Sequence, residues 1–313
     1  MNRARRILLL VFLPILIVLI GVAVYVGTSI TGRGGRPVAG VRGEADAAGR
    51  DIVYYVRRPV DRPPNSIPVV LLASFARSVS DFNELTASLV EAGYLTIAIE
   101  ARGIGGSDGG GPGQSITLHD LADDIAIVER EVGFGPTRRA HLVGHAFGNR
   151  VVRTFARDRP ERVASLTLIA AGGLVPISAK LERAVFVSSA AFFPPARREA
   201  ALRFAFFSEE SEIPDDWTGG WWLWGGLAQM IATASTPSDE FWDAGTAQML
   251  VIQAQDDRLA PPEDSGLRLL ASFPDRVELV MVPDAGHAFL PEQPDWIRRA
   301  LLDFIGRRER EIR

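Results

Sequence analysis

Short apolar runs alternate with longer amphipathic stretches along most of the chain. The runs that predict strands read DIVYYV, VVLLA, YLTIAIE, AHLVG, VASLTLIAA, MLVIQAQ and VELVMVP. The stretches between them carry apolar residues at helical spacing, as at Leu118, Leu121, Ile125 and Val128. Strands that alternate with helices are typical of a mostly parallel sheet flanked by helices. We therefore expect an α/β fold.

One of the helices is predicted between the second and third of these runs, where the chain reads SDFNELTASLVEAG. Ser80 is expected at its N-cap, because a serine side-chain oxygen accepts a hydrogen bond from a first-turn N–H. Gly93 follows the end of the pattern, where glycine adopts the left-handed conformation that ends many helices.

The alternation stops in residues 172–246, which are rich in Phe and Trp. We interpret this stretch as a helical cap inserted over the sheet. Its aromatic residues have three possible roles: an apolar lid over a substrate pocket, the cap's own core, or contacts with a membrane interface. The third role concerns Trp217, Trp221, Trp222 and Trp224.

The first 27 residues predict a membrane anchor. Arg3, Arg5 and Arg6 precede an uncharged apolar run over residues 7–26, which is long enough to span a bilayer. The run is longer than the apolar part of a signal peptide and lacks a clear cleavage site, so we favour a retained signal-anchor over a cleaved signal.

Residues 28–49, rich in Gly and Arg, are interpreted as a tether from this anchor to a body formed by residues 50–171 and 247–313. Arg33, Arg36 and Arg42 follow the apolar run. They reduce the difference in positive charge between its two ends, on which the expected orientation depends. The nearest basic cluster still precedes it, so we expect a single-pass membrane protein with an extracytoplasmic body.

Composition removes several classes of function. The 313 residues are 47% hydrophobic with a formal net charge of −4, and the basic residues are scattered, so no nucleic-acid partner is expected. There are no cysteines, which excludes disulfides, thiolate catalysis and cysteine-based metal sites.

The chemistry centres on the stretch HLVGHAFGN, His141 to Asn149. Its position predicts a strand, a tight turn and then a helix that starts near Gly148, the setting in which a G-x-S-x-G turn holds a serine nucleophile. The central residue here is Ala146, between Gly144 and Gly148. The turn would therefore hold a methyl group where a serine Oγ would project.

Two further residues follow strands in the order acid, then histidine. Asp257 comes after MLVIQAQ, and His287 comes after VELVMVP. Asp256 competes for the acid role, but its spacing to Pro261 is one residue too long for D-x-x-x-P. Taken singly, Asp257 could be a turn carboxylate and His287 a polar loop residue.

The order of Ala146, Asp257 and His287, each at a strand end, resembles the α/β-hydrolase superfamily over roughly residues 50–310. Further matches are VVLLASFARSVSDF and EARGIGGSDG, in which Glu100 replaces the usual Asp. The GHAFG turn resembles a subset of bacterial hydrolase-like sequences.

The resemblance implies that Asp257 orients His287 and that His287 is the general base. The backbone N–H groups of Phe147 and of Phe75 or its neighbour would bind an oxyanion. It implies no cofactor and no metal.

The sequence departs from the family pattern at a second place, beside the expected oxyanion donors. Ala73 and Ser74 stand where the family commonly has His-Gly. A laboratory Ser-to-Ala exchange would explain Ala146 but not this pair, so we favour a natural variant. Ser74 could be a displaced nucleophile or could only line the oxyanion loop.

Two rival motifs are weaker. RGIGGSDG has Asp108 at the last glycine position of a dinucleotide loop, where a carboxylate would repel pyrophosphate. His141 and His145 are expected on a strand and a turn, which removes the single helical face of an H-x-x-x-H zinc site. We expect His145 to pack at the turn and His119 to begin an exposed helix.

Three hypotheses about function follow. The first is an enzyme that uses His287 and Asp257 without a serine, acting by general base chemistry on a small apolar ester-like or carbonyl substrate under the cap. The second is a non-catalytic ligand-binding protein, a pseudoenzyme. The third is a serine hydrolase inactivated by the exchange at Ala146.

Overall fold

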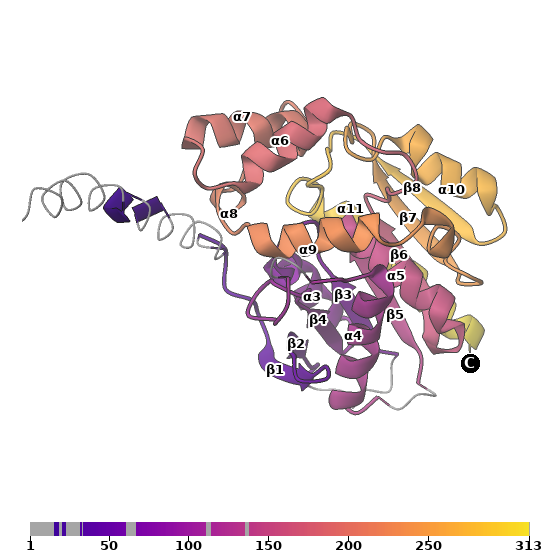
Figure 1. Cartoon of the computed structure of the whole chain (residues 1–313). Coiled ribbons are helices and arrows are strands. Elements are labelled where there is room, and N and C mark those ends of the chain that lie inside the picture. The colour runs from indigo at the N-terminus through magenta and orange to yellow at the C-terminus, as the bar shows by residue number, and fades with distance from the viewer. Residues whose placement is uncertain are drawn as a thin grey trace, which may run out of the picture.

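The structure is a computed structural model that describes residues 16–18, 21–22, 32, 34–60, 67–110, 114–134 and 138–312. An eight-stranded sheet lies at its centre, in the order β1-β2-β4-β3-β5-β6-β7-β8 (Figure 1). The strands are β1 (Val41–Asp46), β2 (Asp51–Arg57), β3 (Val69–Leu72), β4 (Thr96–Ile99), β5 (Ala140–His145), β6 (Val163–Ile169), β7 (Met249–Ala254) and β8 (Val277–Val282).

The sheet is mostly parallel, as the alternating pattern predicted. Strands β3 to β8 run parallel to one another, whereas β1 and β2 are antiparallel to their neighbours. Every residue of β3, β4, β5, β6 and β7 is buried, which explains why these strands read as continuous apolar runs.

Helices cover both faces of the sheet, and each face has its own apolar core. The first core includes side chains of α4 (Leu118–Glu131), α5 (Phe147–Asp158) and α10 (Gly266–Ser272). The second includes α3 (Asn83–Glu91) and α11 (Pro294–Ile312). The strand ends that carry the predicted chemistry are thereby held between two packed layers.

Residues 172–246 contain four α-helices and no strand of the sheet. The helices are α6 (Ala179–Ser189), α7 (Pro195–Ala205), α8 (Asp215–Thr218) and α9 (Leu223–Ala234). Figure 1 shows α6 and α7 side by side at the outer end, with α9 lying against the body. A short 3-10 helix, η4 (Ser238–Glu240), leads back towards β7.

Two local predictions were wrong. Residues 41–46, expected within the tether, form the edge strand β1, whose six residues pair with β2. Ser80 does not cap α3, because residues 79–82 already form a 3-10 helix, η2, whose N-cap is Ser78. The N-cap of α3 is Phe82, which makes no side-chain cap bond. Gly93 does follow the helix, at φ 95°.

The predicted membrane span over residues 7–26 lies largely outside the described residues. Residues 16–18 and 21–22 are described and are helical. Within the described parts of the chain, no helix is long and apolar enough to cross a bilayer.

Candidate active site

Ala146 sits at the tip of a sharp turn between β5 and α5. Its backbone has φ 47° and ψ −102°, a conformation that alanine rarely adopts and that costs on the order of 1–3 kcal/mol. The turn is held by the Ala146 N–H, which donates to Ile169 O at 2.9 Å. Ala146 is partly exposed although His145 and Phe147 are buried. The turn therefore has the geometry that projects a nucleophile, but it presents a methyl group.

The two glycines beside Ala146 are required by close backbone contacts. A Cβ on Gly148 would lie 2.2 Å from Leu72 O, and one on Gly144 would lie 2.6 Å from Asn149 N. Both distances are far below van der Waals contact. The helix α5 can approach the end of β3 because these positions have no side chain.

His287 and Asp257 form a buried hydrogen-bonded pair. The Nδ1 atom of His287 lies 2.9 Å from both carboxylate oxygens of Asp257. Asp257 also accepts hydrogen bonds from Leu259 N at 3.0 Å and Ala260 N at 2.8 Å. Asp256, the competing acid, points to solvent. With Nδ1–H donated to Asp257, the Nε2 atom is left as an acceptor, and it has no partner within the described chain.

Two side chains, buried His145 and partly buried Glu292, hold the loop that carries His287. His145 donates from Nε2 to His287 O at 3.0 Å, and burial lowers the pKa of His145 to about 4, so it is neutral. The carboxylate of Glu292 accepts from Gly286 N at 2.8 Å and from Phe289 N at 3.0 Å. The ring of His287 is therefore positioned through its backbone as well as through Asp257.

The expected oxyanion donors lie in two segments beside the turn. The N–H groups of Phe147 and Phe75 donate no hydrogen bond within the described chain. Phe147 begins α5, where the helix dipole favours negative charge. The loop that carries Phe75 is also held by the cap. The N–H of the next residue, Ala76, donates to Gln229 of α9 at 2.7 Å. Ser74 is buried and donates no side-chain hydrogen bond in this part of the chain.

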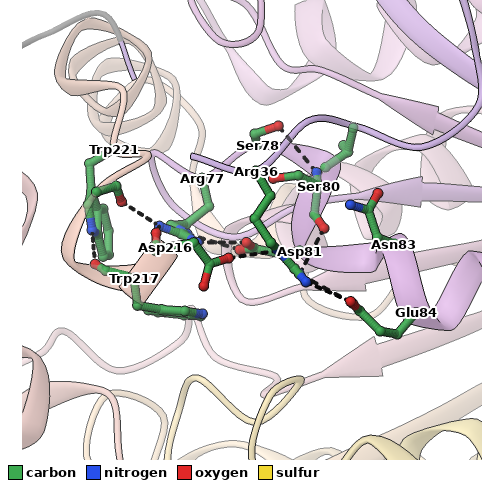
Figure 2. A network of polar contacts seen from close by, with 12 residues as sticks. Arg36, Arg77, Ser78, Ser80, Asp81, Asn83, Glu84, Asp216, Trp217 and Trp221 are labelled. Carbon is green, nitrogen blue, oxygen red and sulfur yellow. Dashed lines mark hydrogen bonds and ion pairs between the residues drawn. The ribbon is translucent and has the colours of Figure 1, made fainter. Parts of the chain in front are cut away.

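The cap contacts residues 73–77, which carry the expected oxyanion donor Phe75 and which we call the oxyanion loop. The Trp222 N–H donates to Ala76 O at 2.9 Å. Arg77 donates from Nη1 to Gly219 O at 3.0 Å and pairs with buried Asp81 at 2.7 Å (Figure 2). The ring of Trp217 lies 4.4 Å from the Arg77 guanidinium. Hydrogen bonds and a ring contact therefore hold the cap against the oxyanion loop.

Arg36 of the predicted tether contacts the same region. Figure 2 shows its guanidinium between Glu84 of α3, at 2.6 Å, and Asp216 of α8, at 2.8 Å. It also donates to Ser80 O at 3.2 Å. The tether is thus bonded to both the body and the cap.

Aromatic side chains of the cap pack towards His287. The rings of Phe206 and His287 lie 5.9 Å apart, and Trp217 and Trp221 are 2% and 3% exposed. The burial of these two tryptophans contradicts the membrane-interface interpretation for them. Trp222 is partly exposed and Trp224 is exposed.

Two cavities in the described chain lie beside the site. One, of about 380 Å³, lies near Arg36, Asp216 and Trp217. The other, of about 820 Å³, is lined by Asp257, Glu209 and Glu292 among others. Neither is lined by Ala146 or His287.

The remaining histidines have separate partners. His141 bonds through Nδ1 to Ser165 Oγ at 2.7 Å inside the sheet. His119 lies in the first turn of α4, partly exposed, and contacts Asp158 and Glu240. Within the described residues, no group of three or more His, Asp or Glu side chains is arranged to hold a metal.

Glu100 lies buried beneath the oxyanion loop. It accepts hydrogen bonds from Ser78 Oγ and from Val79 N, the latter at 3.1 Å. Burial raises the pKa of Glu100 from its usual 4.5 to about 7. In the folded state the carboxyl therefore holds its proton at pH values where the unfolded chain would release it.

We expect Glu100→Gln to change the pH dependence of folding. A raised pKa gives a stabilising contribution that is complete below pH 4.5 and is lost as the pH rises through about 7. The free energy of unfolding of the variant, relative to the parent, should therefore increase from pH 5 to pH 8. Urea unfolding at several pH values measures this difference, and parallel stability curves would contradict it.

Sequence reasoning missed several residues of the site. Gln229, Arg77 and Glu292 reach it only through tertiary packing, and no local spacing marks them. One signal was available for α9, where Gly225 and Gly226 allow a close approach. A Cβ on Gly226 would lie 3.0 Å from the Phe75 ring.

Comparisons with known proteins show which family and which relatives the chain resembles. A family model described as alpha/beta hydrolase family matches residues 69–300. A protein described as the carbamate hydrolase RutD of Variovorax paradoxus (strain S110) is 32% identical over 258 residues, which cover 79% of this chain and 95% of the relative. The 2-hydroxy-6-oxo-6-phenylhexa-2,4-dienoate hydrolase of Burkholderia cepacia is 30% identical over 183 residues, with coverages of 53% and 63%.

The solved structures show the same fold. One of them, a thermophilic esterase from Thermogutta terrifontis with bound malate, has a TM-score of 0.68 and 22% identity. That match covers 86% of this chain and 99% of the esterase.

Proposed function

The chain belongs to the alpha/beta hydrolase family, and from that premise we propose that it is a hydrolytic enzyme that activates water with His287 and Asp257. The observation that carries this proposal is the buried pair itself. Nδ1 of His287 is fixed on Asp257 at 2.9 Å, while Nε2 has no partner among the residues that the structure describes. An imidazole held in this tautomer can accept a proton at Nε2.

The proposed reaction needs no covalent intermediate. His287 takes a proton from water as the water oxygen attacks the substrate carbonyl, and Asp257 stabilises the resulting imidazolium. The N–H groups of Phe147 and Phe75 donate hydrogen bonds to the oxyanion. His287 then returns the proton to the leaving group as the bond to it breaks. A positioned base typically contributes about 10²–10⁴-fold, and an oxyanion donor about 10²–10³-fold.

The proposed substrate is a small, largely apolar ester-like or carbonyl compound held under the cap. The aromatic side chains of Phe206, Phe207 and Trp221 support this proposal, because they bring apolar surface to the His287 side of the cap. The relatives are named for carbamate and dienoate substrates. Hydrolysis of a carbonyl compound is the chemistry those names share with our proposal.

A second candidate is a ligand-binding protein without catalysis. The methyl group of Ala146 favours it, since a serine triad cannot operate without its Oγ. A serine hydrolase inactivated at this position would have the same geometry. The two candidates differ from the enzyme proposal in one respect, which is whether His287 supports turnover.

We expect His287→Ala to lose activity in an ester hydrolysis assay. The parent, in full length, should hydrolyse p-nitrophenyl esters above the buffer rate, and the variant should fall by about 10²–10⁴-fold. His119→Ala is the matched control, because His119 lies on the α4 surface and should leave the rate unchanged. Parent turnover equal to buffer for every ester, or turnover that survives His287→Ala, favours the binding-protein candidate.

The remaining proposal concerns location. We propose that residues 1–27 anchor the chain in a membrane, with residues 28–49 leading to an extracytoplasmic body and residues 172–246 forming the cap. The sequence of the first 27 residues supports the anchor, as does the basic cluster ahead of the apolar run.

We expect the full chain to require detergent for extraction. A chain that begins at Gly34 should be soluble, because it lacks the apolar run and keeps the contacts of Arg36 with Glu84 and Asp216. Fractionation and intact mass measure both. Recovery of the full-mass chain in the aqueous phase without detergent would contradict the anchor.

A further inference from the structure

Two arginines of α5 lie beside the candidate site, Arg153 buried and Arg150 partly buried. Arg153 is 0% exposed, with its guanidinium 5.2 Å from the Phe241 ring and 4.9 Å from the Trp242 ring. It donates from Nε to Asn149 O at 3.1 Å and from Nη2 to Gly172 O. Arg150, three residues earlier on the same helix, donates from Nη1 to Thr233 at 3.0 Å.

Neither arginine has a counter-charge in the described chain. No carboxylate pairs with Arg150 or Arg153, and Nη1 of Arg153 is buried with no hydrogen-bond partner. Burial, together with the nearby charge of Arg150, lowers the pKa of Arg153 to about 9. Burial also lowers the pKa of Arg150. A buried cation with a partly buried one beside it, and no anion between them in the described chain, is unfavourable, and an added anion relieves that cost.

The pair lies between the body and the cap. Gly173 leaves room for it, since a Cβ there would meet Arg150 Nε at 3.0 Å and Arg153 Nη2 at 3.4 Å. Gly172 lies next to Ala260, whose N–H donates to Asp257. The pair is therefore connected to Asp257, on the acid side of the site, through two intervening residues, Gly172 and Ala260.

The cap side of the pair is also connected to the site. Thr233, the partner of Arg150, lies on α9 one turn after Gln229. Gln229 in turn holds the Ala76 N–H next to the proposed oxyanion donor of Phe75. Ligands of α/β folds bind at the carboxyl ends of the parallel strands, and the loop after β6 that carries Gly172 is at such an end.

We propose that Arg150 and Arg153 form an anion site that binds a carboxylate of the ligand. The assignment of that carboxylate to a substrate rests on the proposed function, whereas the anion site itself does not. The donors are supplied by the Nη1–H of Arg153, which has no partner among the described residues, and by the partly buried side chain of Arg150. The substrate is then an otherwise apolar carbonyl compound with one acidic group.

A monoanion fits this site better than a dianion. The cost of moving an ion from water into a low-dielectric site scales with the square of its charge, so a phosphate dianion costs roughly four times as much as a carboxylate. The aromatic rings of Phe241 and Trp242 next to Arg153 offer no replacement for the lost hydration. The surroundings therefore favour a carboxylate over phosphate.

Benzoate and its neutral isostere benzamide test the site directly. The full-length protein in detergent is titrated with each by calorimetry, with tryptophan fluorescence as a second readout. Benzoate should bind, and Arg150→Met should weaken it by about tenfold or more, the effect of losing a hydrogen bond to a charged group. Arg150→Lys should keep most of the affinity.

The matched control is Arg157→Met on the same helix. Arg157 is exposed and pairs with Asp243 at 2.9 Å, so its loss should leave benzoate binding unchanged. Benzoate binding no tighter than benzamide, or an undiminished affinity in folded Arg150→Met, overturns the proposal. Phosphate binding tighter than benzoate overturns the carboxylate assignment.

The test separates this inference from the proposed function. His287→Ala should keep benzoate binding, because His287 contributes no donor to the anion site. If benzoate binds through Arg150 but no ester is hydrolysed, the proposed function fails and the anion site stands. If His287-dependent hydrolysis is found while Arg150→Met leaves benzoate binding intact, the anion site fails alone.

Discussion

Ala146→Ser is expected to create a reactive serine. The backbone at φ 47° and ψ −102° fixes the direction of Cβ, so the new hydroxyl should project from the turn without a change in the fold. A base oriented by Asp257 can then deprotonate it. The variant should be labelled by a fluorophosphonate probe, whereas the parent, which lacks an Oγ at this position, should not.

The control for this experiment is the double variant Ala146→Ser with His287→Ala. It keeps the hydroxyl but removes the base, so labelling should be lost. Labelling that persists in the double variant would point to another serine, of which Ser74 is the first candidate. If folded Ala146→Ser shows no labelling over hours, the turn and the His287–Asp257 pair do not form one reactive site.

Gly148→Ala is expected to have the largest effect on stability. Alanine favours a helix over glycine by about 1 kcal/mol, but here its Cβ would lie 2.2 Å from Leu72 O and 2.9 Å from Ala73 O. Relief of the clash requires α5 to move away from β3. We expect the free energy of unfolding to fall by about 3 kcal/mol, at the upper end of what overpacking typically costs and a large part of the stability of an ordinary protein.

Gly306→Ala is the matched control on another helix. Gly306 lies in α11, and the nearest atom to an added Cβ is Arg310 Nη1 at 3.7 Å. This variant should gain up to about 1 kcal/mol from helix propensity alone. Urea unfolding measures both. Equal stability of the two variants would show that the close approach of α5 to β3 does not govern the turn.

The sequence was sufficient to predict the position of residues that directly follow a strand of the parallel sheet. Ala146, Asp257 and His287 each follow a parallel strand, so their order along the chain brought them to one edge. The Asp256 alternative could be weakened by its spacing to Pro261, and the structure places Asp256 in solvent. The alternating pattern likewise carried enough information for the mostly parallel sheet.

The sequence was insufficient where packing decides. Gln229 and Arg77 reach the oxyanion loop because α9 and the segment before it fold back, and no periodicity encodes that contact. Trp217 and Trp221 look alike in sequence whether they face a membrane or a core, and here they are buried. Four of the six residues of β1 are exposed, so the sequence of β1 has no apolar run that predicts a strand. This strand forms because it pairs with β2.

The most direct test of the central claim is the tautomer of His287 in the parent protein. The claim is that Asp257 holds the ring as a base with Nε2 free, and this does not depend on which substrate is used. Nitrogen-15 NMR of histidine-labelled protein has only four residues to resolve. We predict a protonated, slowly exchanging Nδ1 and an unprotonated Nε2 for His287 at neutral pH. An Nε2–H tautomer, or a ring exchanging freely with solvent, would contradict the claim.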